Sequence, residues 1–347
     1  MNVEEAIQGL TAVMVSDPSL PGILYGGPGV GKSSAVREAR ERADRLLPET
    51  DRFCGIMDLR LNSKNPVELY GLPVREGEKA RWIAPDFFHV LAREKWILLL
   101  EELTTAPLAS MHAGLEIVQE RKVGNIAFHP GTMVVACANS LSDRAGVSSL
   151  TAPLANRFAF HLEILADLRT FERYALRKGI SPLILGFLET RPEFLYRLPR
   201  EGEIHGWPSP RSWEALSRLM AFLPLTETLA VSAVGEEAGG VLVAWSESAH
   251  ILELTEEIAR TGRAGQKRLA TSEQVALIWA LSARLLRDPE ARENIAQFVV
   301  RTLGPESQML FFTEVAQAAD PKDRTELSRL SGWREFVKAH PDTWRGI

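Results

Sequence analysis

The sequence predicts an α/β fold in which a parallel sheet lies between helices, followed by an all-helical region. In the first 165 residues, short apolar segments alternate with segments of helical apolar spacing, a pattern typical of parallel sheets covered by helices. A glycine-rich loop joins one of these apolar segments to a helix. After Ala166 the strand pattern stops and helical spacing continues. At roughly 100–200 residues per domain, the 347 residues suggest two or three domains.

Each element follows from its local pattern. We expect β-strands where β-rich apolar runs occur, at Gly22–Tyr25, Arg52–Leu61, Trp96–Leu100, Thr132–Ala138 and Phe158–Leu165. We expect helices where apolar residues recur with helical spacing, at Val3–Val15, Ser33–Leu47, Pro85–Arg93, Pro107–Arg121, Leu168–Lys178, Ser181–Arg191, Pro210–Phe222 and Thr271–Arg287. Residues 199–210, rich in proline and glycine, are expected to form a loop or a linker, and 260–268 an exposed loop.

Composition excludes several classes of protein. Apolar residues make up 45% and charged residues 24% of the chain, as in ordinary globular proteins, and the net charge of −5 argues against a dedicated nucleic-acid binder. The longest apolar run, Trp96–Leu100, is far too short to span a membrane, and the N-terminus lacks a signal-peptide pattern, so we expect a cytoplasmic protein. Cys54 and Cys137 lie in apolar runs and are expected to be buried free thiols. No histidine pair has zinc-ligand spacing.

The glycine-rich loop is a phosphate-binding motif. It fits G-x-x-x-x-G-K-[ST], follows an expected strand and opens an expected helix, which is the context that the motif requires. Glycines let backbone N–H groups surround phosphates, and the helix N-terminus adds further donors. Lys32 would reach the β- and γ-phosphates and the Ser33 hydroxyl would bind Mg²⁺. The sequence therefore predicts ATP and Mg²⁺ as cofactors, with nucleotide-binding residues Gly26, Gly27, Pro28, Gly29, Val30, Gly31, Lys32, Ser33 and Ser34.

A second pattern is the buried-strand run Trp96–Leu100, which ends in Glu101 and Glu102. In a phosphate-loop sheet the first carboxylate at this place orients the metal and the second activates the attacking water. The alternative is a solvated acidic pair at a strand end. The first position is usually Asp; Glu101 is one methylene longer, so a backbone shift or a different carboxylate rotamer must absorb the change in metal distance.

With these motifs placed, residues 1–225 resemble a AAA+ ATPase, and within that class the MoxR-like branch with a dynein-related core. Four further stretches carry the resemblance. Met133–Asn139 resembles the strand that ends in the sensor 1 asparagine, Leu150–Phe158 the segment with an arginine finger, and Trp207–Trp213 the lid segment with the sensor 2 arginine. The segment Leu69–Pro85 resembles the helix-2 insert of this branch. The chain has Ser140 where the family usually has proline, which affects only the local turn.

The resemblance implies roles for three residues. Asn139 would contact the attacking water or the γ-phosphate, Arg157 would act as a finger in the neighbouring subunit's site, and Arg211 would couple lid closure to the nucleotide. Each residue also has a structural alternative, namely a turn asparagine, a surface salt bridge and a helix-start arginine. If Arg157 is not the finger, Arg144 is the next candidate.

The resemblance also implies an organisation and a function. It predicts a AAA+ core at 1–165, a helical lid at 166–225 and a helical C-terminal extension at 226–347. It implies an ATPase ring, typically a hexamer, with chaperone-like remodelling activity on a partner protein, often one carrying a von Willebrand factor A-like domain. One alternative is a nucleotide-gated scaffold with little hydrolysis, favoured by Glu101. Another is a McrB-like nucleic-acid-associated GTPase motor, disfavoured by the low pI of about 5.9.

Two smaller patterns stay open. Residues 122–129 have Val, Ile and Phe around Gly124-Asn125, which predicts a hairpin that faces either a client or only the solvent. Residues 75–79 form a charged segment of the insert. This segment could equally face a client or be only a solvated turn. Trp207 and Trp213 are expected to pack within the lid.

Overall fold

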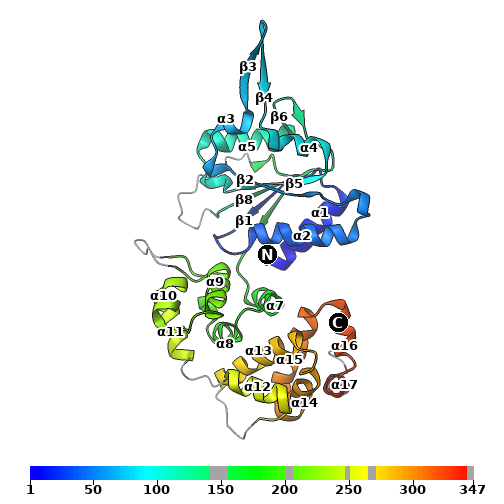
Figure 1. Ribbon diagram of the computed structural model, residues 1–347, viewed down its shortest axis with the longest axis vertical. Helices are drawn as coiled ribbons and strands as arrows, with labels where there is room; N and C mark the ends of the chain where they lie inside the picture. Colours follow the sequence, from blue (N-terminus) through cyan, green and yellow to red (C-terminus); the bar gives the residue numbers. More distant parts are fainter. Residues whose placement is uncertain (141–149, 151–154, 200–205, 247–250, 265–270, 342–347) are drawn as a thin grey trace. The chain divides into compact units, whose positions relative to one another are not determined.

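The computed structural model describes residues 1–140, 150, 155–199, 206–246, 251–264 and 271–341. The chain divides into two compact units, Met1–Leu165 and Ala166–Ile347. Figure 1 shows both units, and each is described by itself. No helix in the described ranges has the length and apolar character needed to cross a membrane.

A five-stranded sheet of parallel strands forms the centre of the first unit, as the sequence predicts. Its strands, in the order β2-β5-β8-β1-β9, are β2 (Gly55–Arg60), β5 (Trp96–Glu101), β8 (Met133–Ala138), β1 (Gly22–Tyr25) and β9 (Phe160–Glu163). The fold class is therefore confirmed: an α/β unit with a parallel sheet precedes an all-helical region. The order matters for the site because β8 pairs with both β5 and β1.

The position of each strand in the sheet explains its sequence. All of β8 is buried, as are Ile97–Leu100 of β5, and both strands are continuous apolar runs because helices cover both faces of the sheet. In the edge strand β2, only Gly55 and Leu59 are buried, and the other residues are half-buried or exposed. Cys54 directly precedes this edge strand and is exposed, so the expectation of a buried thiol is wrong there; Cys137, in β8, is buried as expected.

Helices cover the two faces of the sheet, giving three layers (Figure 1). On one face lie α1 (Val3–Ser16) and α2 (Lys32–Leu46), which pack against each other. On the other face lie α3 (Pro66–Tyr70), α4 (His89–Arg93) and α5 (Leu108–Glu120). Helix α1 starts at Asn2, whose side chain accepts from the Glu5 N–H while the Glu5 carboxylate accepts from the Asn2 N–H. This reciprocal capping box satisfies two donors that the helix itself leaves unpaired.

Short 3-10 turns connect several of these elements. In the first unit they are η1 (Glu49–Asp51), η2 (Leu61–Ser63), η3 (Asp86–Phe88) and η4 (Leu103–Thr105). The turn η4 follows β5 and contacts β8, so it lies at the carboxyl ends of two central strands.

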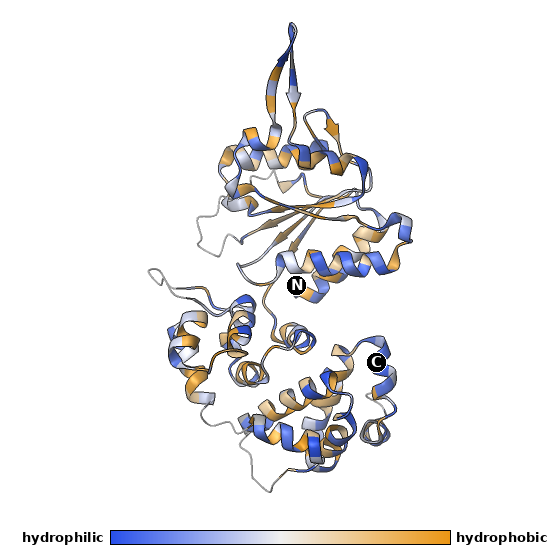
Figure 2. Cartoon of the chain, viewed as in Figure 1, coloured by the Kyte–Doolittle hydropathy of each residue, from blue (hydrophilic) through white to orange (hydrophobic). Residues whose placement is uncertain are grey.

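Two hairpins extend from the first unit and differ in burial. The predicted hairpin is present as β6 (Lys122–Val123) and β7 (Ile126–Ala127), and both Val123 and Ile126 are buried. The charged segment 75–79, which the sequence analysis left open, is the tip of a second hairpin, β3 (Leu72–Glu76) and β4 (Lys79–Ile83). It projects away from the sheet, and every residue of β3 is exposed (Figures 1 and 2).

In its described residues, the second unit has helices and connecting segments and no strand. Its helices are α7 (Leu168–Lys178), α8 (Pro182–Thr190), α9 (Pro210–Met220), α10 (Glu227–Val234), α11 (Glu236–Ser246), α12 (Ile251–Thr261), α13 (Thr271–Arg287), α14 (Arg292–Thr302), α15 (Pro305–Ala318), α16 (Pro321–Leu327) and α17 (Ser331–Ala339), with the 3-10 turn η6 (Pro192–Phe194).

Two hydrophobic cores stabilise this unit, and α13 contributes to both. Buried side chains of α7 to α11 form one core, which includes Trp213 of α9 and Trp279 of α13. The other core gathers α12 to α17 around Phe311, Phe312 and Phe336. The boundary that we placed at residue 225 falls between α9 and α10, which contact each other. The division of this unit into a lid and an extension therefore stays a prediction.

Candidate functional site

The phosphate-loop motif connects β1 to α2, the strand–loop–helix arrangement that the motif requires. Gly29 and Gly31 have φ angles of 85° and 108°, a region that residues with a Cβ rarely adopt. The chain can therefore turn tightly here, with Gly31 standing directly before the first turn of α2. This turn leaves the N-terminus of α2 at the loop, where its unpaired N–H groups favour an anion.

The side chain of Lys32 lies back across the loop. Its Nζ donates to the carbonyl oxygens of Gly26 and Gly27 at 2.6 and 3.0 Å and to Oδ1 of Asn139 at 3.2 Å. The ammonium group is thus held by neutral acceptors beside the loop. Phosphate oxygens are stronger acceptors for a cationic donor than these carbonyl groups.

The topology of the sheet explains why Asn139 reaches Lys32 although 107 residues separate them. Asn139 follows β8, and β8 is the direct neighbour of β1, from which the phosphate loop departs. Carboxyl ends of neighbouring parallel strands meet at one edge of a sheet, which is where ligands bind in open α/β folds. The predicted sensor asparagine and the predicted phosphate-binding lysine are therefore in contact.

The two predicted acidic residues lie at the end of β5, on the other side of β8. Glu101 is the last residue of this strand, and Glu102 follows in a left-handed conformation with φ 60° and ψ 35°. For a residue with a side chain this conformation costs roughly 1–2 kcal/mol. Both carboxylates are half-buried, so they remain accessible at the strand end. Unusual backbone conformations of this kind are frequent at functional sites.

Two threonines that the sequence analysis did not single out hold this region together. The Thr105 hydroxyl contacts Oε2 of Glu102 at 2.9 Å and the Glu102 carbonyl oxygen at 3.1 Å. The Thr104 hydroxyl, which is buried, accepts from the N–H of Asn139 at 3.1 Å. The Thr-Thr pair after the acidic residues is visible in the sequence, but its contact with residue 139 depends on the sheet order.

The residues present fit a magnesium–nucleotide complex. Ser33 is in the first turn of α2, half-buried, and Glu101 ends the strand beyond β8, so a hydroxyl and a carboxylate lie on neighbouring parts of one edge. Such oxygen ligands suit Mg²⁺. The buried thiol of Cys137 lies among the same groups: burial raises its pKa, and the carboxylates of Glu101 and Glu102 act in the same direction. Cys137 is therefore a neutral thiol beside the loop.

The predicted finger, Arg157, is half-buried in the turn before β9. The charge of Arg157 reaches Tyr70 at the end of α3. Burial and Glu116 raise the pKa of Tyr70 to about 12, and Arg157 opposes this rise. The hydroxyl of Tyr70 donates to Glu116 at 2.5 Å. The alternative finger Arg144 and residues 151–154 of the same motif lie outside the described residues. The trans role of Arg157 stays a prediction.

Arg211, the predicted sensor 2 residue, belongs to the second unit. Ser209 caps α9 through the Ser212 N–H, and Pro210 occupies the first helical position, so Arg211 stands in the first turn and is exposed. Trp213 is fully buried and donates from its indole N–H to the Phe194 carbonyl oxygen at 2.8 Å. Trp213 therefore packs in the helical core, and the role of Arg211 stays a prediction.

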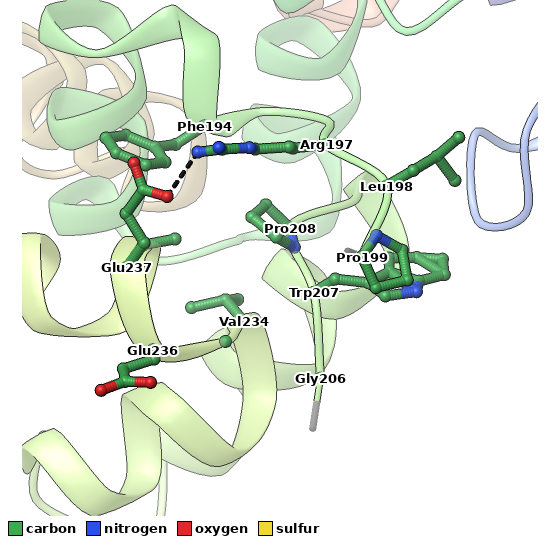
Figure 3. Close-up of a pocket in the computed structure, with 12 residues that line it drawn as sticks. Phe194, Arg197, Leu198, Pro199, Gly206, Trp207, Pro208, Val234, Glu236 and Glu237 are labelled. Carbon is green, nitrogen blue, oxygen red and sulfur yellow. Dashed lines mark hydrogen bonds and ion pairs between the residues drawn. The ribbon is translucent and has the colours of Figure 1, made fainter. Parts of the chain in front are cut away.

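A pocket of about 380 Å³ lies in the second unit between the segment around Trp207 and the start of α11 (Figure 3). Apolar side chains form most of its wall, and an ion pair between Arg197 and Glu237 at 2.5 Å lies on one side. A Cβ on Gly206 would come within 2.3 Å of the Ala233 carbonyl oxygen, so the backbone itself closes another side. None of the predicted site residues lines this pocket.

The second unit also buries a group of ionisable side chains between α7, α8 and α15. Arg169 pairs with Glu172 and Glu189, each at 3.2 Å, and the charge of Glu314 acts on the same group. Burial, with a contribution from Glu189, raises the pKa of Glu172 to about 10. In the described part of the chain, no group of three or more acidic, histidine or cysteine residues could hold a metal ion. The cluster therefore consists of the buried carboxyl group of Glu172, protonated at neutral pH, and its neighbours Arg169, Glu189 and Glu314.

The chain matches no family model and no curated protein. Among solved structures it is similar to a RuvB mutant from Thermotoga maritima, with 13% identity over 97% of this chain and 87% of that one and a TM-score of 0.34. It is also similar to a putative ATPase from Cytophaga hutchinsonii (12% identity, 94% and 79% coverage, TM-score 0.33). A third similar structure is NtrX from Brucella abortus in complex with ADP (15% identity, 97% and 67% coverage, TM-score 0.37). Likenesses at this level of identity and superposition assign no activity to the chain.

Proposed function

We propose that the chain binds and hydrolyses ATP with Mg²⁺ as a AAA+ ATPase, and that it works as a ring that remodels a partner protein, as MoxR-like proteins do. One observation carries the ATPase part: Lys32 of the phosphate loop contacts Asn139 at the end of β8. The neighbouring strand, β5, ends at Glu101, and Glu102 follows it. A cation for phosphates, a polar amide and two carboxylates at one sheet edge are the groups that phosphoryl transfer to water requires.

The proposed reaction assigns a task to each group. When bound, Mg²⁺ supplies Lewis-acid stabilisation of phosphate charge. Lys32 exchanges its carbonyl acceptors for phosphate oxygens, and Ser33 with Glu101 would hold the metal. Glu102 accepts a proton from the attacking water, while Asn139 orients that water or the γ-phosphate. Arg157 of one subunit would complete the site of the next, which is the reason to expect a ring.

The projecting hairpin β3–β4 supports the partner-protein part of the proposal. Leu72 and Ile83 form a cross-strand pair that is 59% and 52% exposed, and Trp82 is 51% exposed. An isolated two-stranded hairpin is marginal in water, so exposed apolar residues of this kind indicate contact with another protein. A partner with a von Willebrand factor A-like domain is the one that the MoxR resemblance suggests.

Glu101 supports a second candidate. A glutamate in place of the usual aspartate changes the distance between strand end and metal by one methylene group, and slow turnover would leave a nucleotide-gated scaffold. Binding and assembly would then occur with ATP, without product formation.

A turnover assay with ATP and with GTP, each with and without DNA, separates these possibilities. We expect Mg²⁺-dependent phosphate release with ATP that does not require DNA, and specific activity that rises with protein concentration as subunits associate. ATP-dependent assembly without phosphate release would favour the scaffold. Activity that requires GTP or DNA would instead favour the McrB-like motor.

A further inference from the structure

We infer that Thr105 is a positioning residue for hydrolysis, which holds the Glu102 carboxylate in place through its hydroxyl group; this inference rests on the proposed ATPase function. It concerns a side chain to which neither the phosphate-loop pattern nor the acidic strand end assigns a role. The contact joins Thr105 Oγ1 and Glu102 Oε2 at 2.9 Å.

The need for such a contact follows from the backbone of Glu102. This residue leaves β5 in the left-handed conformation, so the chain bends sharply at the carboxylate that must face the attacking water. A glutamate side chain has three rotatable bonds, and a half-buried one at a strand end has room to turn. The single proton of the Thr105 hydroxyl faces both Oε2 at 2.9 Å and the Glu102 carbonyl oxygen at 3.1 Å, and Oε2 is the nearer and the charged acceptor. The hydrogen bond to Oε2 restricts the carboxylate and leaves Oε1 to accept a proton.

The turn η4 makes the Thr105 contact rigid. The Thr105 N–H donates to the Glu102 carbonyl oxygen at 3.2 Å, which closes the turn. Leu103 is fully buried and Thr104 nearly so, and these two side chains anchor the turn in the core. The Thr105 hydroxyl, which donates the hydrogen bond, therefore belongs to a turn that is anchored in the core.

The neighbouring threonine links the same turn to the other polar group of the site. Thr104 accepts from the Asn139 N–H, and the Asn139 side chain in turn accepts from Lys32. A single turn thus fixes Glu102 through one hydroxyl and the end of β8 through the next. Rate losses of about a hundredfold from displacements near 1 Å show why such fixing matters.

A merely structural threonine would also bond to the carbonyl oxygen three residues earlier, as Thr105 does at 3.1 Å. The two roles differ in what they would affect. A structural role changes stability and ATP affinity, whereas a positioning role changes the hydrolysis step and acts only through the Glu102 carboxylate.

The test is single-turnover hydrolysis of Mg–ATP by the full chain at assembling concentrations, with ATP affinity measured by calorimetry. We expect Thr105→Val, which keeps the shape and removes the hydroxyl, to slow hydrolysis about tenfold with ATP affinity unchanged. Thr105→Ser keeps a hydroxyl and should restore the rate. In a Glu102→Gln background, Thr105→Val should cause no further loss, because the group on which it acts is already gone.

Several outcomes would overturn the inference. They are an unchanged or faster rate in Thr105→Val, an equal loss in Thr105→Ser, or the same loss in the Glu102→Gln background. If Thr105→Val does not fold, Thr105→Ala takes its place against Thr105→Ser. An unmodified chain that releases no phosphate overturns the proposed ATPase function, and the inference with it; a hydrolysing chain that is insensitive to Thr105→Val overturns the inference alone.

Discussion

The two units of the chain place their ionisable side chains in opposite environments. In the first unit, Lys32, Glu101 and Glu102 are half-buried where strands end. In the second unit, Glu172 is fully buried between helices, beside the carboxylate of Glu189. Both arrangements cost folding free energy, because a polar group that is removed from water loses hydrogen bonds that the protein must replace.

The difference reflects the two architectures. A parallel sheet ends in loops at a common edge, so polar side chains there stay reachable for a ligand. A helical core has no such edge, and a carboxyl group placed inside it becomes neutral instead of binding a ligand. Half-buried charged groups at the sheet edge of the first unit are therefore candidates for chemistry, whereas carboxyl groups in the helical core of the second unit make stability depend on pH.

The largest effect that this comparison predicts is the loss of nucleotide binding in Lys32→Ala. The variant removes the cation that faces the phosphates, and a charge-assisted contact contributes up to about 3 kcal/mol, so affinity should fall about a hundredfold or more. Calorimetry with ATP and Mg²⁺ measures this change. The matched control is Lys79→Ala at the exposed end of β4, which should bind ATP normally. Wild-type ATP affinity in Lys32→Ala would show that Lys32 does not bind phosphates, and the edge of the first unit would then not be a ligand site.

Glu102→Gln should separate binding from hydrolysis. An amide cannot accept the proton of the attacking water, so we expect turnover to fall by about two orders of magnitude or more while ATP binding and assembly remain. Phosphate-release kinetics give the measurement, and Glu101→Asp, which restores the usual acid at the metal position, is the control that should keep turnover. If Glu101→Gln abolishes turnover while Glu102→Gln does not, the two carboxylates have exchanged roles.

A mixture of two inactive variants tests whether the site of the first unit is completed by another subunit. Arg157→Ala should bind ATP and fail to hydrolyse it, and Lys32→Ala should fail to bind. Mixed rings would contain some interfaces with an intact loop and an intact arginine, so partial ATPase activity should reappear on mixing. A mixture that co-assembles and stays inactive would show that Arg157 is not the finger.

The last prediction concerns the stability of the second unit. The unfolded Glu172 carboxyl ionises near pH 4.5, whereas burial raises its folded pKa to about 10. The folded chain therefore holds an extra proton between these values, and the free energy of unfolding falls as the pH rises through this window. Glu172→Gln stays neutral in both states and should gain stability over the unmodified chain with rising pH.

Thermal unfolding at a series of pH values measures this gain. The two proteins should have similar melting temperatures near pH 4.5, and Glu172→Gln should melt several degrees higher near pH 9. The exposed Glu193→Gln is the control and should show no such trend. A constant difference at every pH would mean that Glu172 is ionised in the folded chain.

The sequence by itself determined the fold class and the local motifs of the site. Continuous apolar runs predicted the buried strands, and the glycine pattern with Lys32 and Ser33 predicted a phosphate loop between β1 and α2. Glu101 and Glu102 were predicted at a strand end and lie there. All of these features depend on neighbours within a few residues, so a linear pattern contains them.

Only the tertiary structure decided which distant residues meet. The order of the strands brings Asn139 to Lys32 and Thr104 to Asn139, and no linear spacing contains that information. It also decided burial: Cys54 is exposed because it precedes an edge strand, and Glu172 is hidden because three helices pack around it. Helix and strand patterns depend on local spacing, whereas burial and long-range contacts depend on which elements pack together.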